Sequence, residues 1–196
     1  MAETPDATNP ADRTQSPGTP GTSPQSGPHP GVGVRVGHGY DLHRLEVRAP
    51  EGPGRPLIVG GVTLEHDRGP VAHSDGDVLY HAVTDALLGA LALEDIGQLF
   101  PDDDDENAGR DSADFVREAV RLISARGWRV VNLDATVVLE RPRIGAHKRT
   151  IRTNLATLLG VGEDAVNVKG KSHERVDAVG EGRAIEAHAV VLLASS

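Results

Sequence analysis

The stretch Val34-Arg35-Val36-Gly37-His38-Gly39-Tyr40-Asp41-Leu42-His43 opens with an apolar run typical of a β-strand and ends on two possible metal ligands. In an extended chain, side chains two residues apart point to the same face. Asp41 and His43 can therefore converge on one atom, while His38 points to the opposite face. Two ligands do not make a metal site, so a third must lie further along the chain.

The composition narrows the classes of protein that remain. The chain has 196 residues, of which 38% are hydrophobic, which fits one domain with its own core. A formal net charge of −9 and only 3% aromatic residues argue against a nucleic-acid-binding protein, which needs a basic face. The sequence contains no cysteine, so any metal must be held by His, Asp or Glu.

Residues 1–33 differ in composition from the rest of the chain. They hold seven of the thirteen prolines and almost no large apolar residue, so they cannot bury enough surface to offset chain entropy. We expect a disordered tail over 1–33 and a folded domain over 34–196. The sequence shows neither an apolar run near 18 residues nor a secretory signal, which favours a cytoplasmic protein that does not bind membranes.

The folded part alternates between two periodicities without a strict strand-helix-strand repeat. The pattern predicts a hairpin around Gly60-Gly61, a loop over 95–101 and helices that end near Gly127 and Gly160. We expect strands from Val34 into the opening stretch and at 57–59, 62–64, 128–139, 166–169 and 187–193, and helices from Val78, over 112–125 and from about 146 to 159. This order predicts an α+β fold, a mixed β-sheet with helices packed on one face.

The first predicted helix offers a candidate for the third ligand. Asp77, His81 and Asp85 recur at intervals of four on one face of an otherwise apolar helix. One interpretation is that these three residues form a solvated face of the helix. The other is that His81 is a metal ligand whose second ring nitrogen hydrogen-bonds to Asp77 or Asp85. With Asp41 and His43, His81 gives three protein ligands and one open position, as in a catalytic zinc site. The chain has nine histidines, so spacing alone leaves other sets of three open.

Two further polar stretches have residue types that could bind ligands. Residues 169–174, Lys-Gly-Lys-Ser-His-Glu, resemble the end of a P-loop, but Ala165 stands where that motif needs a glycine. Lys171, Ser172 and Glu174 either bind a phosphate and a divalent cation or form a charged turn. The acidic run 102–106 lacks the spacing and the glycine of a calcium loop and is interpreted as a solvated loop.

Four motifs taken together resemble a known family. They are Gly37 to His43, Ala-His-Ser-Asp-Gly-Asp at 72–77, His-Ala-Val-Thr-Asp-Ala-Leu-Leu-Gly at 81–89 and Asp-Ile-Gly-Gln-Leu-Phe-Pro-Asp at 95–102. In this order and spacing the chain, from Val34 to its C-terminus, is similar to the 2-C-methyl-D-erythritol 2,4-cyclodiphosphate synthase family of the non-mevalonate isoprenoid pathway. Several long motifs that coincide are far more specific than any one of them.

The resemblance implies a homotrimer with active sites between subunits. Its substrate would be 4-diphosphocytidyl-2-C-methyl-D-erythritol 2-phosphate, which the family cyclises with release of CMP. Asp41, His43 and His81 match the zinc ligands. Glu174 matches the ligand of a second cation, Mg²⁺ or Mn²⁺, that lies between the two phosphates of the diphosphate.

The resemblance also implies the residues that touch the substrate. His73 and Ser74 would lie over the methylerythritol, Asp95 and Gly97 would contact its hydroxyls, and Ser172 would bind a phosphate. The expected catalytic residues are His73 and Ser172. The full expected substrate-binding set is Asp41, His43, His73, Ser74, Asp95, Gly97, Asp102, Pro142, Arg143, Ile144, Ser172 and Glu174, of which 142–144 would form the cytidine pocket.

The chain departs from the family pattern at three positions, one of which is Val179, where many members have an arginine that faces the trimer axis. Lys171 replaces a hydroxyl residue and can hold a phosphate as a point charge, while Arg143 replaces the usual lysine with a different donor geometry. Two other functions fit the metal ligands as well. One is a zinc phosphohydrolase that cleaves a nucleoside diphosphate linkage, and the other is a non-catalytic, zinc-stabilised trimer that binds a phosphorylated ligand.

Overall fold

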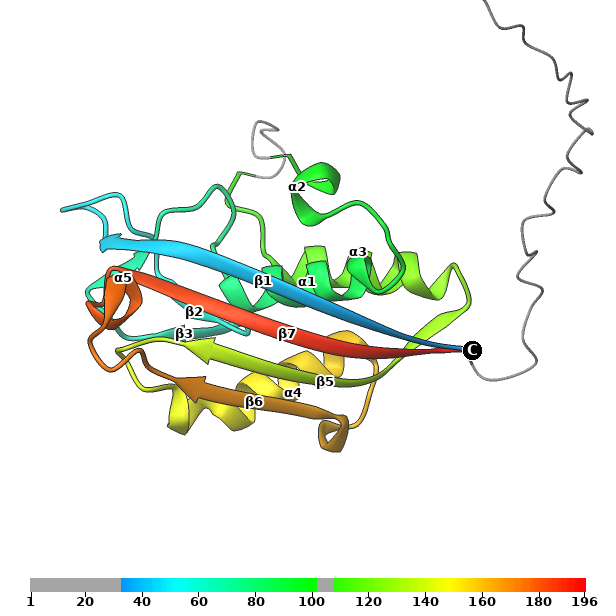
Figure 1. Ribbon diagram of the computed structural model, residues 1–196. Coiled ribbons are helices and arrows are strands. Elements are labelled where there is room, and N and C mark those ends of the chain that lie inside the picture. The colour runs from blue at the N-terminus through cyan, green and yellow to red at the C-terminus, as the bar shows by residue number, and fades with distance from the viewer. Residues whose placement is uncertain (1–32, 102–107) are drawn as a thin grey trace, which may run out of the picture. The chain divides into compact units, whose positions relative to one another are not determined.

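The protein is built on a five-stranded sheet, seen in a computed structural model that describes residues 33–101 and 108–196 (Figure 1). The sheet order is β4-β1-β7-β5-β6. β1 pairs antiparallel with β7, β7 antiparallel with β5, and β5 parallel with β6. The sheet is therefore mixed, as predicted. Its strands are β1 (Val34–Val47), β4 (Arg68–Pro70), β5 (Trp128–Val138), β6 (Val166–Lys171) and β7 (Ala184–Ser195).

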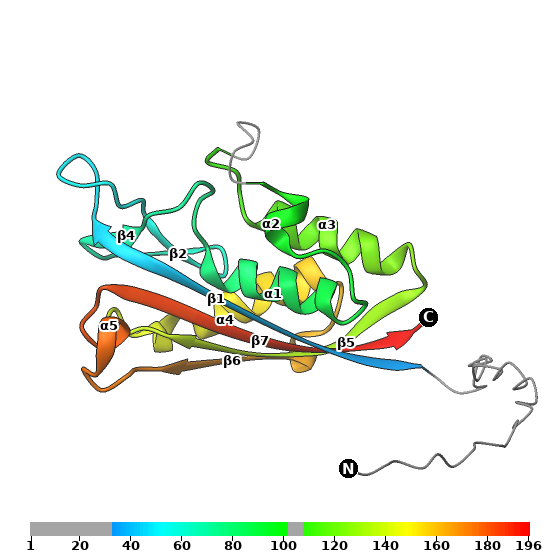
Figure 2. The ribbon, with the colours of Figure 1, turned by 45° about the horizontal axis from the view of Figure 1, so that its top comes forward.

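Three helices cover one face of this sheet, α1 (Val78–Gly89), α3 (Ala113–Ser124) and α4 (Lys148–Leu159) (Figure 2). α1 packs over β1 and β7, whereas α4 packs on β6 and α3 lies against both other helices. The core between the sheet and the helices consists almost entirely of Leu, Ile, Val and Ala side chains, as the low aromatic content requires. The predicted fold class, α+β with helices on one face, is confirmed.

Two glycines in β1 allow α1 to lie directly on the strand. A Cβ atom on Gly37 would lie 1.8 Å from the carbonyl oxygen of Ala86, and one on Gly39 would lie 1.9 Å from that of Ala82. No side chain fits at either position, because both neighbours are helix backbone. The Gly-His-Gly motif therefore sets the distance between strand and helix, and with it the distance between Asp41 and His81.

Within the described residues, the other face of the sheet is covered only at one end, by the short helix α5 (Asp177–Gly180), whose Val179 packs on Val138 and Ala184. The exposed apolar side chains of this face, which we call the open face, are Val34, Val36, Tyr40, Leu42 and Val190, each between 42% and 66% exposed. The ring of His38 also lies on this side, where it stacks on His188 with 5.7 Å between ring centroids. His38 therefore points away from Asp41 and His43, as the strand alternation predicted.

Several predicted boundaries hold and others need correction. The hairpin is found at the predicted residues, as β2 (Leu57–Val59) and β3 (Val62–Leu64). β1, β6 and β7 are longer than predicted because strand pairing extends beyond the apolar runs. The sequence did not predict β4, and the loop expected over 95–101 contains a helical turn. The short helical elements are α2 (Ile96–Leu99), α5 (Asp177–Gly180) and the 3-10 turns η2 (Ile144–His147) and η3 (Glu163–Ala165).

The expected disordered tail, apart from Gly33, and the acidic run at 102–106, including Asp102, lie outside the described residues. The division into a tail at 1–33 and a domain at 34–196 stays a prediction. Within the described part of the chain, no helix has the length and apolar character needed to cross a membrane.

Candidate metal centre and substrate cavities

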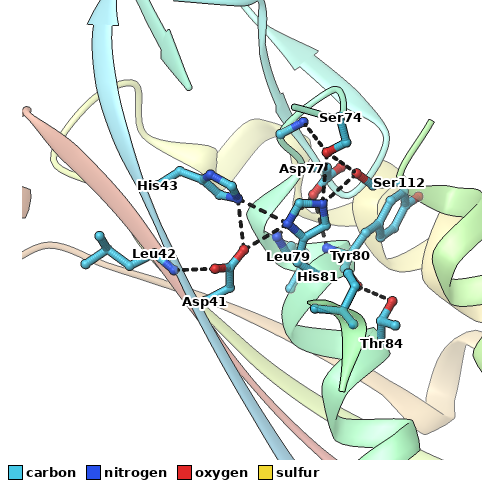
Figure 3. Close-up of polar contacts among 12 residues, drawn as sticks. Asp41, Leu42, His43, Ser74, Asp77, Leu79, Tyr80, His81, Thr84 and Ser112 are labelled. Carbon is cyan, nitrogen blue, oxygen red and sulfur yellow. Dashed lines mark hydrogen bonds and ion pairs between the residues drawn. The ribbon is translucent and has the colours of Figure 1, made fainter. Parts of the chain in front are cut away.

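Asp41, His43 and His81 form one group of possible metal ligands (Figure 3). The Oδ2 atom of Asp41 lies 2.9 Å from Nε2 of His43 and 2.9 Å from Nδ1 of His81. The two histidine nitrogens lie 3.1 Å apart. Strand alternation brings Asp41 and His43 to the helix-covered side of β1, and α1 presents His81 to them. The predicted convergence of these three side chains is confirmed.

The donor set fits a divalent cation. Ligand atoms on a tetrahedral zinc ion with bonds of about 2.0–2.1 Å lie about 3.3 Å apart, close to the separations found here. Burial alone would raise the pKa of the Asp41 carboxyl, but hydrogen bonds and charge from His43 and His81 outweigh it and hold the pKa well below its usual range. Asp41 is therefore ionised at neutral pH, as a metal ligand must be.

The second ring nitrogen of His81 does not face an aspartate of its own helix. Nε2 lies 2.9 Å from Oγ of Ser112 and 3.2 Å from Oγ of Ser74. Asp77 instead caps α1 and accepts a hydrogen bond from the backbone N–H of Gly61 at 2.7 Å. Asp85 accepts one from the N–H of Ile96 at 2.9 Å. The expectation that Asp77 or Asp85 holds His81 was wrong, because backbone donors take up both carboxylates.

A cavity of about 480 Å³ opens beside these ligands, and we call it the metal-centre cavity. Of the residues expected to bind substrate, His73, Ser74 and Gly97 line it together with the three ligands. Asp95 is not among its lining residues, because it caps α2 and accepts a hydrogen bond from the N–H of Gln98 at 2.9 Å.

A second cavity, of about 390 Å³, lies beside β5, β6 and the start of α4, and we call it the Glu174 cavity. Arg143, Ile144, Ser172 and Glu174, all expected in the site, line it. The hydroxyl of Ser172 donates to Oε1 of Glu174 at 3.3 Å. Pro142 is not a lining residue but follows a cis peptide bond in the adjacent loop. The cationic side chains in the lining are Arg141, Arg143, Lys148 and Lys171, which suits an anionic ligand such as a diphosphate.

The two cavities have no lining residue in common. The metal-centre cavity is built on β1 and α1, whereas the Glu174 cavity is built beside β5 and β6, and β7 lies between the two groups of strands. The single chain therefore does not bring Glu174 to Asp41, His43 and His81.

Sequence reasoning missed several residues that shape these cavities. Ser112 contacts His81 from the start of α3, and Phe115 packs against the His81 ring with 5.7 Å between centroids. Lys148 lines the Glu174 cavity from α4. None of these residues is separated from a ligand by an interval that matches the period of a strand or a helix. The sequence pattern therefore gave no signal for them.

A carboxylate and two imidazoles that converge in an open cavity, on an α+β fold, define a divalent-metal-binding protein. Residues 34–194 match the model of the YgbB family, which is most of the chain. The chain belongs to this family.

Relatives and solved structures agree with this assignment. The chain is 57% identical over 159 residues to the chloroplastic 2-C-methyl-D-erythritol 2,4-cyclodiphosphate synthase of Arabidopsis thaliana, covering 81% of this chain and 66% of that one. It is 50% identical over 162 residues to the synthase of the same name from Chromobacterium violaceum, covering 83% and 99%. The solved structure of Plasmodium falciparum IspF in complex with CDP superposes with a TM-score of 0.72 at 38% identity, covering 84% and 97%. The resemblance seen in the sequence motifs is thereby confirmed.

Proposed function

We propose that this chain is a metal-dependent 2-C-methyl-D-erythritol 2,4-cyclodiphosphate synthase. The substrate would be 4-diphosphocytidyl-2-C-methyl-D-erythritol 2-phosphate, and the products would be the cyclic diphosphate and CMP. The observation that carries the proposal is the metal-centre cavity. Residues from all four family motifs, including Asp41, His81 and Gly97, line this cavity beside one possible metal position.

In this proposal Asp41, His43 and His81 hold zinc, and Glu174 holds a second cation, Mg²⁺ or Mn²⁺. The chemistry that the bound cations supply is neutralisation of phosphate charge, since the attacking 2-phosphate and the diphosphate are both anions. A donor set of one carboxylate and two imidazoles with an open position is one that catalytic zinc accepts.

The remaining residues bind and orient the substrate. His73, Ser74 and Gly97 line the metal-centre cavity and would hold the methylerythritol 2-phosphate. Arg143 and Ile144 would enclose the cytidine. The 2-phosphate oxygen attacks the β-phosphorus while the bond from that phosphorus to the CMP oxygen breaks. No side-chain nucleophile is needed, so holding the two phosphates close together in line supplies most of the rate.

The separation of the two cavities supports an active site shared between copies. One substrate molecule carries both the methylerythritol 2-phosphate and the cytidine diphosphate, yet the residues that would bind them lie on opposite sides of β7. A head-to-tail arrangement of copies, which closes into a ring, would join one chain's metal-centre cavity to the next chain's Glu174 cavity. We assign the ring three copies, as the resemblance implies.

The open face offers the surface for such an assembly. Val36 is 66% exposed and Val34 is 62% exposed, at the start of β1 on the open face. A contiguous apolar surface of this kind marks an interaction site in a stable protein. Two expectations from the sequence stay predictions. One is the cytoplasmic location, and the other is the catalytic role of His73 and Ser172.

The function is tested by phosphorus NMR of the full chain with zinc, magnesium and the cytidyl substrate. The proposal predicts a cyclic diphosphate and CMP in equal amounts. Acyclic phosphate products would instead identify a zinc phosphohydrolase. Unchanged substrate in the presence of bound zinc would leave the non-catalytic metal-binding trimer and contradict both enzymes.

A further inference from the structure

We propose that Ser112 and Asp75 are positioning residues for His81, which they hold in the one ring tautomer and orientation that can bind the metal. The inference rests on the proposed metal site at Asp41, His43 and His81. It adds to that site a hydrogen-bonded chain of two residues that lie on different segments from any ligand.

The geometry of the His81 ring defines its tautomer. Nδ1 is the atom that faces Asp41 and His43, at 2.9 and 3.1 Å, so it must be unprotonated to accept a metal. The proton of the neutral ring then lies on Nε2, which donates to Oγ of Ser112 at 2.9 Å. A hydrogen bond to the nitrogen that does not bind the metal is the usual way in which a histidine ligand is fixed.

Asp75 fixes the direction of the Ser112 hydroxyl. Oγ of Ser112 donates to Oδ1 of Asp75, and the backbone N–H of Ser112 donates to Oδ2 of the same carboxylate at 3.2 Å. With its proton directed to Asp75, the hydroxyl presents only lone pairs to His81. It can therefore accept the Nε2 proton but cannot donate to Nε2, which favours the tautomer that carries its proton on Nε2.

The hydroxyl of Ser112 has no competing structural task. Ser112 occupies the N-cap position of α3, where a serine side chain commonly accepts a hydrogen bond from the helix backbone. Here its side chain makes no capping bond, and Asp111 accepts from the N–H of Ala113 at 2.9 Å instead. Ser112 is fully buried, so water does not satisfy its hydroxyl. Its contacts are to His81, Asp75 and, at 3.5 Å, the hydroxyl of Ser74.

A second hydroxyl near Nε2 does not replace this role. Oγ of Ser74 lies 3.2 Å from Nε2, further than Ser112, and it also accepts from the backbone N–H of Gly76 at 3.2 Å. Among the described residues, no carboxylate accepts from the Ser74 hydroxyl as Asp75 accepts from Ser112. Ser112 is therefore the partner whose proton position is fixed.

The test measures zinc affinity of the full chain by competition with a chelating dye, and separately the visible absorption spectrum of the cobalt-substituted protein. In Ser112→Ala we expect zinc affinity to fall by about 10- to 100-fold, as is typical when the outer partner of a metal-bound histidine is removed. The cobalt spectrum should change shape, because the His81 ring is no longer fixed. Unfolding of the metal-free variant should show a loss of stability, because the partly buried Asp75 carboxylate and His81 ring each lose a hydrogen-bond partner, whereas no helix cap is lost.

Two further variants make the result decisive. Ser124→Ala removes an exposed hydroxyl from the other end of α3 and should bind zinc as wild type does. Asp75→Asn keeps the size of the side chain, removes its charge, and should weaken zinc binding by about 10-fold. If Ser112→Ala does not fold, Asp75→Asn decides the question.

Zinc affinity in Ser112→Ala or Asp75→Asn within two-fold of wild type, with an unchanged cobalt spectrum, would overturn this inference and leave the proposed enzyme intact. A wild-type chain that binds no zinc would overturn the metal site and this inference together. The two failures are therefore distinguishable without measuring catalysis.

Discussion

The Nδ1 atom of His81 lies 2.9 Å from the Oδ2 atom of Asp41, although the two residues are forty positions apart in the chain. Asp41 is fixed on β1, and His81 on the helix that covers it. Gly37 and Gly39 make this contact possible, because neither position has space for a side chain between strand and helix. The metal centre thus depends on the packing of α1 on β1.

Substitution of Gly39 should therefore disrupt both the fold and the site. In Gly39→Ala the new Cβ atom would lie 1.9 Å from the carbonyl oxygen of Ala82, so helix and strand must move apart. Overpacking of this kind lowers stability by about 1–3 kcal/mol or more, and here we also expect weaker zinc binding. Denaturant unfolding and zinc titration measure the two effects.

Gly89→Ala is the matched control for Gly39→Ala. A Cβ atom there meets only the carbonyl oxygen of His38, at 4.0 Å, and Gly89 lies in α1. Stability should stay unchanged or rise by up to about 1 kcal/mol, because alanine favours helix. Equal stability of both variants would show that the close approach of α1 to β1 is not required.

Zinc should stabilise the folded chain through His81. A ligand that binds only the folded state at one hundred times its dissociation constant adds about 2.7 kcal/mol to the free energy of unfolding. We expect this gain in wild type and in His147→Ala, which removes a histidine outside the metal group. We expect no gain in His81→Ala. Thermal unfolding with and without zinc measures it, and an equal gain in His81→Ala would rule out its role as a ligand.

The stability of the chain should depend on pH through Asp77. Complete burial raises the pKa of Asp77 to about 6, although backbone hydrogen bonds from Gly61, Gly60 and Tyr80 favour the carboxylate. The usual value near 4 applies in the unfolded chain, so the folded state binds the proton more tightly. The resulting stabilisation is fully present below about pH 4 and is lost as the pH rises through 6.

This effect is isolated by comparison with Asp77→Asn, which does not titrate. Relative to that variant, wild type should be more stable at pH 4 than at pH 7 by up to about 3 kcal/mol. Denaturant unfolding at a series of pH values gives the difference. The difference in free energy of unfolding between wild type and Asp77→Asn should therefore change with pH. A difference that stays constant, or one that shows wild type gaining stability toward pH 7, would contradict the assigned pKa of Asp77.

A charge on the open face should prevent assembly. Val36→Asp places a carboxylate on an apolar surface that we propose is buried between copies, where an unpaired charge is costly. We expect a folded monomer by circular dichroism and light scattering. Thr150→Asp, at an exposed position in the first turn of α4, should assemble as wild type does. A trimer in Val36→Asp would place the interface elsewhere.

The sequence predicted those parts of the molecule that depend on local periodicity. Alternation along β1 predicted that Asp41 and His43 lie on one face of the strand and His38 on the opposite face. The spacing of polar residues on the first predicted helix indicated His81 as the third ligand. The sequence did not predict that Ser112 holds His81, since that contact joins segments 31 positions apart and depends on how α3 packs. Asp77 and Asp85 have the spacing expected of carboxylates that hydrogen-bond to a metal-bound histidine. In the structure, backbone N–H groups donate to both carboxylates instead.

The separation of the two cavities could not be predicted from sequence either. The family resemblance assigns Glu174 and His81 to one site, yet the cavities that they line lie on opposite sides of β7. Strand order results from pairing between distant segments, such as β1 with β7, for which the sequence carries no local signal. The family resemblance, rather than the residue pattern, indicated that neighbouring copies join the two halves.

The most direct test of a synthase whose active site is shared between copies is subunit complementation. His81→Ala and Glu174→Gln should each be nearly inactive alone, measured by release of CMP from the cytidyl substrate. In mixed trimers assembled from equal amounts of both, some sites combine an intact His81 from one copy with an intact Glu174 from the next. Random mixing predicts recovery of roughly a quarter of wild-type activity. Mixed trimers that form but recover no activity would contradict the shared site.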